Sequence, residues 1–322
     1  MRFPLADWID EHLDCRHNLG SSGMRGSIAH PRPNAREVGT ASPERLTEAL
    51  ALGIRVDPRR VFLTHGATEA NSLVTWFRRR AEGGAAPKFR VQHPEYPPLS
   101  DVATWAGFRA GTPNASAALG LVSLPRNPEG VQWSDAEFET WASGAKSLLV
   151  DETFREFSGA GSRSTAGRPG LWVTGTFTKF FAADDVRVGY VVAPPEESAR
   201  FARFHGVVTD ELPPYSVAAA VRILEDRVDL ARRVRELFER NRRVLSSALP
   251  PGRAVRAPVF FDRVADGDRL ARRCLRASIL VCPGRFFGAR GGVRLSLTRR
   301  TFPADFAAYL RVRNSATGRS GA

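Results

Sequence analysis

From Val61 onward, short apolar runs alternate with stretches that have helical spacing. The apolar runs cover residues 61–64, 89–92, 121–124, 147–151, 172–174 and 188–192, and helical patterns follow the first two, at 66–77 and 99–105. Such alternation is typical of a mostly parallel sheet that helices cover. The sequence therefore predicts an α/β fold in which ligands gather at the carboxyl ends of the strands.

A different pattern follows the proline-rich joint at 212–215. Helical spacing at 217–224 and 230–249 precedes three shorter strand-like runs, at 259–261, 279–281 and 293–297. We therefore expect a large domain of residues 40–212 with the mostly parallel central sheet. A smaller α+β domain would combine residues 1–39 with residues 213–322.

Several local signals mark element ends. Residues 5–13 predict a short helix, and the Gly- and Ser-rich segment that follows, 18–26, predicts an ordered loop. Ser42 and Pro43 predict the start of a helix, because serine suits the N-cap and proline the first helical position. The Ser- and Gly-rich tail 314–322 is predicted to fray.

The charge balance is strongly basic. The chain has 47 Lys and Arg against 34 Asp and Glu, a formal net charge of +13. The arginines are spread along the chain, and the short clusters at 78–80, 232–233 and 242–243 are expected on polar helix faces. This spread favours a solvated surface over a nucleic-acid site, so we expect no nucleic-acid partner.

The cysteines and the apolar segments bear on compartment. Cys15, Cys274 and Cys282 are odd in number and lack metal-ligand spacing, which predicts reduced thiols and no metal site. The N-terminus turns acidic before an apolar segment develops, and no run approaches 18 apolar residues. We expect a soluble cytoplasmic protein with no membrane partner.

Lysine is rare in this chain. Only Lys88, Lys146 and Lys179 occur, so 44 of the 47 basic residues are arginine. Lys179 lies in a turn between two strand-like runs. Because lysine can form a Schiff base and arginine cannot, Lys179 suggests covalent amine chemistry.

Other polar residues also follow predicted strands. Asp151, Gly66 and Asn127 lie just past strand ends, as Lys179 does, so these four can converge on one crevice. The helix that opens after Gly66 offers backbone N–H groups to a phosphate, although an ordinary capped helix explains the same residues. Arg294 lies inside an apolar strand, where a guanidinium requires an anion that it can bind with two prongs.

Seven short motifs share one order along the chain. They are Gly66 to Thr68, His93 to Tyr96, Asn127 to Gly130, Val150 to Glu152, Thr176 to Lys179, Arg187 to Tyr190 and Val293 to Ser296. In this order and spacing they resemble the class I/II pyridoxal-phosphate-dependent aminotransferases, which have the aspartate-aminotransferase fold (fold type I). The resemblance runs from about residue 40 to about residue 300, and the short chain is most similar to the histidinol-phosphate aminotransferase and threonine-phosphate decarboxylase branch.

The resemblance implies a role for each matching residue. Lys179 would hold pyridoxal 5′-phosphate as an aldimine and then move a proton, while Asp151 would pair with the pyridinium nitrogen. Asn127 would donate to the phenolate oxygen, Tyr96 would stack on the ring, and Arg294 would bind the substrate α-carboxylate. The residues expected at the phosphate are Gly66, Ala67, Thr68, Thr176 and Arg187.

Two positions depart from the family pattern. Phe154 stands where relatives usually have a tyrosine that donates a second hydrogen bond to the phenolate oxygen. Val38 stands near the position of an aromatic residue that reaches the phosphate of the neighbouring subunit in many relatives. The resemblance still implies a homodimer. His17, Asn18 and Arg25 fall in a segment that relatives fold over the site, and they are candidates for side-chain recognition or simply for a solvated loop.

The resulting functional prediction is an aminotransferase that moves an amino group from an α-amino acid to a 2-oxo acid. The alternatives are a decarboxylase or lyase with the same cofactor, or a degenerate non-catalytic relative. A regulator variant of this fold carries an N-terminal DNA-binding domain, and about 40 residues before the resemblance are too few for one.

Overall fold

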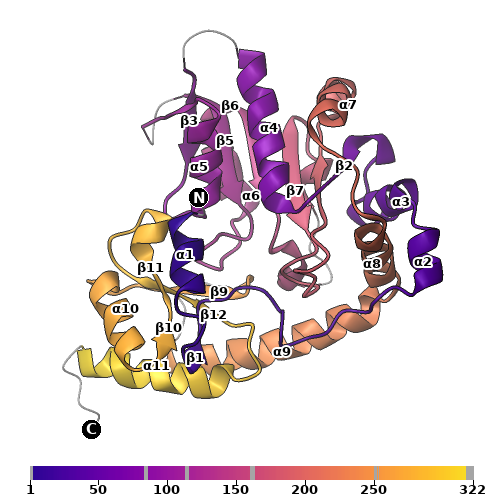
Figure 1. The fold of residues 1–322 in the computed structure, drawn as a ribbon. Coiled ribbons are helices and arrows are strands. Elements are labelled where there is room, and N and C mark those ends of the chain that lie inside the picture. Colours follow the sequence, from indigo (N-terminus) through magenta and orange to yellow (C-terminus); the bar gives the residue numbers. More distant parts are fainter. Residues whose placement is uncertain are drawn as a thin grey trace.

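A seven-stranded sheet forms the centre of the structure, a computed structural model that describes residues 3–82, 86–112, 116–159, 164–249, 252 and 254–316. The strand order is β2-β8-β7-β6-β5-β3-β4 (Figure 1). The strands are β2 (Val61–Thr64), β3 (Lys88–Val91), β4 (Arg109–Ala110), β5 (Ala117–Ser123), β6 (Ala145–Asp151), β7 (Leu171–Thr176) and β8 (Gly189–Val192). All neighbours are parallel except β8, which is antiparallel to β2 and β7. The predicted mostly parallel sheet is confirmed.

Helices bury both faces of this sheet. One face packs against α4 (Ala67–Glu82), α5 (Pro97–Trp105) and α7 (Pro195–Val208). The other face packs in a second buried cluster with α3 (Pro43–Ile54), α6 (Asp135–Ala142) and α8 (Pro214–Glu225). Neighbouring strand residues such as Leu149 and Val150 belong to different clusters. Burial on both faces explains why these strands read as continuous apolar runs.

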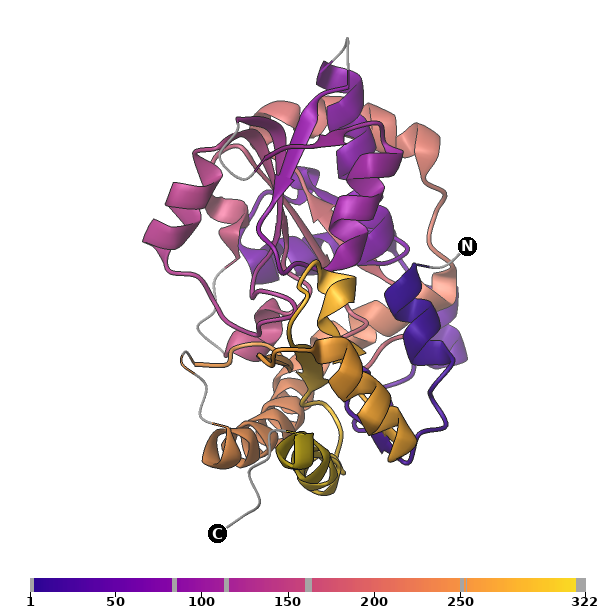
Figure 2. The same ribbon diagram turned by 90° about the vertical axis from the view of Figure 1, so that its left-hand side faces the viewer.

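A smaller α+β part follows α8. Its antiparallel sheet has the order β11-β12-β9, built from β9 (Val259–Asp262), β11 (Cys282–Pro283) and β12 (Val293–Ser296). Its helices are α9 (Arg227–Ala248), α10 (Gly267–Arg276) and α11 (Phe302–Ala316), and Figure 2 shows this part below the large sheet. Short 3₁₀ turns complete the described elements, at η1 (Pro58–Arg60), η2 (Arg155–Ser158), η3 (Thr165–Gly167) and η4 (Gly284–Phe287). The domain boundaries stay a prediction, because one buried cluster contains both Val122 and Leu295.

The N-terminal segment joins the two parts. Helix α1 (Pro4–Asp10) is shorter than predicted and contacts β11, while α2 (Ala35–Gly39) packs against α8 (Figure 1). Between them, β1 (His17–Asn18) pairs in parallel with β10 (Ile279–Leu280). The loop prediction was therefore wrong at Asn18, because the backbone of the small part offers it a strand partner.

The predicted helix start at Ser42 is confirmed. Its hydroxyl accepts a hydrogen bond from the backbone N–H of Arg45 at 3.1 Å, and α3 begins at Pro43. The predicted fraying from residue 314 was wrong for residues 314–316, which continue α11, and the rest of that tail lies outside the described residues.

The arginine clusters lie on helices and pair with nearby carboxylates. Ion pairs join Arg78 to Glu82, Arg232 to Asp229 and Arg242 to Glu239. Among the residues that the structure describes, no helix is long and apolar enough to cross a membrane. The same residues contain no group of three or more His, Cys, Asp or Glu side chains suited to a metal ion.

Candidate active site

A cavity of about 330 Å³ lies where the carboxyl ends of the large-sheet strands face the small part. All ten residues predicted for the site line it, namely Gly66, Ala67, Thr68, Tyr96, Asn127, Asp151, Thr176, Lys179, Arg187 and Arg294. Asp151 ends β6 and Thr176 ends β7, as expected for a ligand site of a parallel sheet. The volume suits one small ligand.

A larger hollow of about 1320 Å³ lies elsewhere, between α6 and β9. Its wall includes Trp133, Trp141 and Asp262, and none of the ten predicted residues. The smaller cavity is therefore the candidate active site, because complementary functional groups converge there.

Lys179 follows β7 in a turn against the N-terminal loop. Its backbone oxygen accepts a hydrogen bond from the N–H of Met24 at 3.0 Å. Although part of its surface faces the cavity, protein atoms surround the side chain, and this burial lowers the pKa of Lys179. Asp184 opposes the shift most strongly, whereas Arg294 adds to it. A lowered pKa increases the neutral fraction of the amine, which is its nucleophilic form.

Sequence reasoning missed Asp184. A Cβ placed on Gly23 would lie 3.6 Å from both Cδ of Lys179 and Oδ2 of Asp184, so this glycine faces the lysine and the carboxylate together. Oδ2 of Asp184 is buried without a hydrogen-bond partner among the described residues. A carboxylate in that position acts on the charge of Lys179 through space.

Asp151 is held by two donors. Asp151 is 3% exposed, and its Oδ1 accepts a hydrogen bond from the N–H of Thr153 at 2.9 Å. Its Oδ2 accepts from Nδ2 of Asn71, also at 2.9 Å. Asn71 was not predicted, and its sequence signal is a polar residue on the buried face of α4.

Gly66, Ala67 and Arg187 form the predicted phosphate end of the cavity. Gly66 has φ of 103°, which glycine adopts without steric cost, and a Cβ there would lie 3.2 Å from Nη2 of Arg187. Helix α4 begins at Ala67, where the first backbone N–H groups of a helix have no partner within it. Arg187 has φ of 55°, a conformation that residues other than glycine seldom adopt. It forms no ion pair within the described part of the chain. An anion would pair with this guanidinium and accept hydrogen bonds from the N–H groups at the start of α4.

The two threonines of this turn differ in what they can donate. The Thr176 hydroxyl lies 2.9 Å from the backbone oxygen of Val188, so its proton already has an acceptor. Thr178 also lines the cavity and was not predicted. Because its hydroxyl can still turn toward the cavity, Thr178 is the better donor to an anion.

Arg294 is a buried cation that lacks an anion. It is 2% exposed, and its Nη2 donates to the backbone oxygen of Gly20 at 2.7 Å. Nη1 lies 3.4 Å from Oδ1 of Asn127, and the guanidinium stacks over the ring of Phe287 at 5.0 Å. Its Nε is buried without a partner, and no carboxylate of the described residues pairs with it. A bound carboxylate would supply the missing charge.

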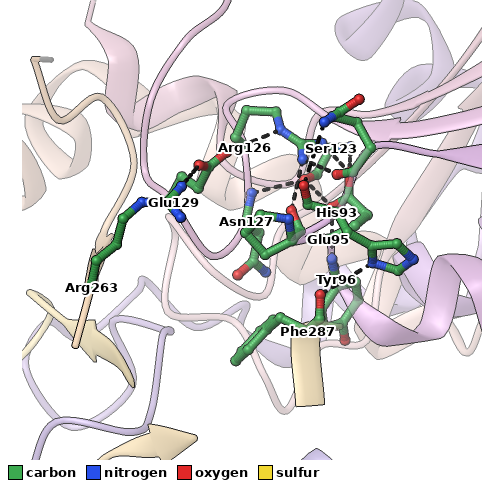
Figure 3. A network of polar contacts seen from close by, with 11 residues as sticks. His93, Glu95, Tyr96, Ser123, Arg126, Asn127, Glu129, Arg263 and Phe287 are labelled. Atoms are coloured by element: carbon green, nitrogen blue, oxygen red, sulfur yellow. Dashed lines mark hydrogen bonds and ion pairs between the residues drawn. The ribbon is translucent and has the colours of Figure 1, made fainter. Parts of the chain in front are cut away.

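A buried ion pair supports two cavity residues (Figure 3). Glu95 and Arg126, both fully buried in their side chains, form the pair. Oε1 of Glu95 accepts from the N–H of Tyr96 at 2.7 Å and from the hydroxyl of Ser123 at 2.5 Å. The Ser123 oxygen accepts the N–H of Asn127 at 2.9 Å, so one network orients both cavity residues. Burial raises the pKa of Glu95, and Arg126 opposes that shift.

The N-terminal helix closes one side of the cavity. Phe3, Leu5, Ala6, Ile9 and Asp10 contribute to this wall. The ring of Phe3 meets that of Tyr96 edge to face at 6.1 Å. Burial raises the pKa of Tyr96, so its phenol stays neutral. The sequence predicted a helix here but not its place in the site.

The three loop candidates do not line the cavity. His17 contacts Asp305 at 2.8 Å, and Oδ1 of Asn18 accepts backbone N–H groups of its own loop. Arg25 is exposed, and Ser22 is the residue of this loop that reaches the cavity.

Phe154 and Val38, the two positions that depart from the family pattern, have different surroundings. Phe154 lines the cavity, is 3% exposed and packs edge to face with Phe157 at 6.1 Å, so an apolar ring stands where relatives have a hydroxyl. Val38 lies in α2, away from the cavity.

Comparison with solved structures shows the same fold. Aspartate aminotransferase from Thermus thermophilus with maleate superimposes with a TM-score of 0.75 at 20% identity, over 97% of both chains. The PLP-dependent cyclase OrfR superimposes with a TM-score of 0.76 at 22% identity, over 98% of this chain and 97% of that one. The predicted fold type I architecture is confirmed.

Sequence comparison identifies the family to which this chain belongs. Capreomycidine synthase from Streptomyces vinaceus is 25% identical over 92% of this chain and 89% of that protein. Histidinol-phosphate aminotransferase from Paenarthrobacter aurescens is 27% identical over 78% of this chain and 74% of that protein. The family profile for aminotransferase class I and II matches residues 35–302. Because that match spans most of the chain, the protein belongs to the class I and II aminotransferase family of pyridoxal-phosphate-dependent enzymes.

Proposed function

We propose that this protein is a pyridoxal-phosphate-dependent aminotransferase that moves an amino group from an α-amino acid to a 2-oxo acid. The observation that supports the proposal best is the charge pattern of the cavity. Arg187 and Arg294 both line it, and neither pairs with a carboxylate of the described residues. Two cations without a carboxylate partner among the described residues match two anionic groups, the cofactor phosphate and the substrate α-carboxylate.

The residues present fit the cofactor. Arg187 and the N–H groups of Ala67 and Thr68 would hold the phosphate, since Gly66 leaves room beside the guanidinium. Asp151 would accept the N–H of the ring nitrogen.

The ring has contacts of its own in this proposal. Asn127 would donate to the ring hydroxyl oxygen, and Tyr96 would cover one face of the ring. When bound, pyridoxal phosphate supplies an electron sink for the electrons of a broken bond to the substrate Cα.

Lys179 would act on protons. Its Nζ takes a proton from the substrate Cα and returns one later, which requires an amine that is neutral before the transfer. Burial provides this by lowering the pKa of Lys179. Arg294 would orient the substrate by its carboxylate, because its guanidinium keeps N–H groups without a protein partner, among them that of Nε.

A decarboxylase, lyase or cyclase is the second candidate. Phe154 supports it, because the cavity lacks a hydroxyl that relatives direct at the cofactor. Two similar proteins also carry names other than aminotransferase, capreomycidine synthase and the cyclase OrfR. A non-catalytic relative is the third candidate.

The first experiment tests cofactor attachment. Purified protein mixed with pyridoxal phosphate should acquire a visible absorption band, and borohydride reduction should remove that band while it fixes the cofactor covalently to the protein. Lys179→Ala should lose this band, whereas Lys146→Ala, at an exposed position, should keep it. A band that persists in Lys179→Ala would refute the assigned lysine.

The second experiment separates the candidate reactions. Incubation with single amino acids should convert the bound cofactor to its amino form and release the matching 2-oxo acid. Carbon dioxide or an eliminated group without that conversion would support the second candidate. No spectral change with any amino acid, despite cofactor binding, would support the third.

We also propose a cytoplasmic homodimer. Class I and II aminotransferases are typically dimeric, and the three cysteines of this chain are free, as suits a reducing compartment. Sedimentation velocity on the purified protein tests the dimer, and a monomer at micromolar concentration would contradict it.

A further inference from the structure

A buried amide on α4 contacts the carboxylate that we assign to the cofactor ring. Nδ2 of Asn71 donates to Oδ2 of Asp151 at 2.9 Å, and Asn71 is 1% exposed. The two residues are 80 positions apart in sequence. A polar side chain buried this deeply inside a helix requires partners, and this one has found the site carboxylate.

A second contact defines which way the amide points. The hydroxyl of Thr174 donates to Oδ1 of Asn71 at 2.6 Å. Thr174 is fully buried on β7, and it pairs in register with Asp151 on β6. Because the carboxylate of Asp151 only accepts, it requires the NH₂ group of Asn71, and the amide oxygen is left to accept the hydroxyl proton of Thr174. The chain Thr174–Asn71–Asp151 therefore has one internally consistent direction.

The other carboxylate oxygen is also held. Oδ1 of Asp151 accepts the backbone N–H of Thr153 at 2.9 Å, so each oxygen has one protein donor. Two donors from different elements fix the plane of a carboxylate, and each oxygen keeps a lone pair for a further partner. This is the arrangement needed to direct one oxygen at a ring N–H.

We propose that Asn71 is a positioning residue that holds the Asp151 carboxylate toward the ring nitrogen of the cofactor, and that Thr174 holds the Asn71 amide in place. The inference rests on the proposed role of Asp151. Helix α4 begins at Ala67, about one turn before Asn71. One rigid helix thus offers its N-terminus to the phosphate and its first buried amide to the ring carboxylate, which sets the distance between the two contacts.

Four variants separate the steps of this argument. Asn71→Leu removes the donor, and Asn71→Asp keeps the shape but turns a second carboxylate toward Asp151. Thr174→Val frees the amide, whereas Thr174→Ser retains the hydroxyl and should restore the wild-type behaviour. The matched control is Thr75→Val, which also removes a fully buried hydroxyl, in this case from α4. The Thr75 hydroxyl donates to the backbone oxygen of Asn71 at 2.7 Å and not to its amide.

The readouts are the dissociation constant of pyridoxal phosphate and the state of its ring nitrogen. The first comes from absorption titration of cofactor-free protein, and the second from the ¹⁵N chemical shift of bound [¹⁵N]pyridoxal phosphate. We expect Asn71→Leu to weaken binding roughly tenfold to a hundredfold, the range for a lost hydrogen bond to a charged group. In Asn71→Leu the ring nitrogen should also lose part of its protonation, less so in Thr174→Val. In Asn71→Asp it should stay protonated, because the second carboxylate either shares a proton with Asp151 or adds negative charge beside the ring.

Three results would overturn the inference. One is a wild-type affinity and ¹⁵N shift in Asn71→Leu, and another is an equal effect of Thr75→Val, which would indicate a purely structural role. Failure of Thr174→Ser to restore the ¹⁵N shift would remove Thr174 from the argument. Thr174→Val, which changes the side-chain volume little, serves as the test if Asn71→Leu does not fold. If wild-type protein itself does not bind pyridoxal phosphate, the proposed function fails, and that outcome is distinct from all of these.

Discussion

At the scale of single residues, the site depends on how charges are placed around Lys179. Burial lowers the pKa of this amine, and the carboxylate of Asp184 is the largest influence in the opposite direction. The pKa of Lys179 is therefore set by two opposing effects: burial favours the neutral amine, and Asp184 favours the ammonium. Neither effect is visible in the motif that surrounds Lys179 in the sequence.

The variant Asp184→Asn should shift the titration of Lys179 to lower pH. Removing the carboxylate leaves burial with less opposition, so the pKa of Lys179 falls further and more amine is neutral at a given pH. Labelling of cofactor-free protein with an amine-specific reagent across pH, read by peptide mass spectrometry, measures the midpoint. Asp185→Asn, whose exposed carboxylate contacts His30 at 2.9 Å, is the control. A midpoint that stays in place would contradict the role of Asp184.

The variant Phe154→Tyr should add a hydroxyl inside the cavity. Phe154 lines the cavity and is buried, so the new phenol would donate toward the ring oxygen of the cofactor. Such a bond favours the unprotonated form of the bound chromophore, and its absorption titration should move down by roughly one pH unit. Phe157→Tyr, in the apolar cluster behind it, should leave the titration unchanged. An upward shift would refute this account of the departure.

At the scale of elements, two loops act as one unit. The loop after β3 carries Glu95 and Tyr96, and the loop after β5 carries Arg126 and Asn127. The ion pair of Glu95 with Arg126 joins them, and Ser123 links Glu95 to Asn127 (Figure 3). Tyr96 and Asn127, the residues predicted to contact the cofactor ring from these loops, are therefore positioned by Glu95 and Arg126, which do not line the cavity, together with Ser123, which does.

Breaking this pair should destabilise the protein strongly. Glu95→Gln leaves the buried Arg126 with only the carboxylate of Glu129, 3.6 Å from its Nε, so we expect a cost of up to about 3–5 kcal/mol of unfolding free energy. The double variant Glu95→Gln/Arg126→Met should cost less than the sum of the two single variants. Urea unfolding of cofactor-free protein measures each value. The exposed pair of Arg232 with Asp229 provides the control, because Arg232→Ala should cost less than about 1 kcal/mol. If the double variant costs as much as the sum of the two single variants, the contributions of Glu95 and Arg126 to stability are independent, which would contradict this prediction.

At the scale of the whole molecule, the cavity exists only where separate parts of the chain meet. Its wall combines α1, the start of α4, the ends of β6 and β7, and Arg294 on β12 of the small sheet. A ligand bound there contacts all of them at once. Binding should therefore stabilise the complete fold rather than one element.

Pyridoxal phosphate should accordingly raise the melting temperature of the protein. A ligand that binds only the folded state adds about 2.7 kcal/mol at a hundred times its dissociation constant. Thermal denaturation at increasing cofactor concentration measures the effect. Pyridoxal without phosphate should stabilise far less, because Arg187 and the start of α4 then lack their anion. A melting temperature independent of the cofactor would contradict the proposed site.

The sequence by itself determined the architecture and, through the resemblance of its seven motifs to the family, the residues expected to contact the cofactor. The sheet could be predicted because each strand is buried on both faces and therefore reads as an apolar run, whichever neighbours it has. Lys179, Asp151 and Arg294 could be predicted because each is a chemically costly residue at a strand end or inside a strand. These signals are local, so they survive without knowledge of packing.

Only the tertiary structure decided what supports those residues. Asn71 contacts Asp151 across 80 positions, Glu95 contacts Arg126 across 31, and the carboxylate of Asp184 faces Lys179 beside Gly23. A polar residue on a helix or loop has no periodic pattern that names its partner, since the partner is set by how α4, the large sheet and the N-terminal loop pack. For the same reason α1 was predicted as a helix but not as a wall of the cavity, and His17 was a candidate for recognition until the fold placed it against Asp305.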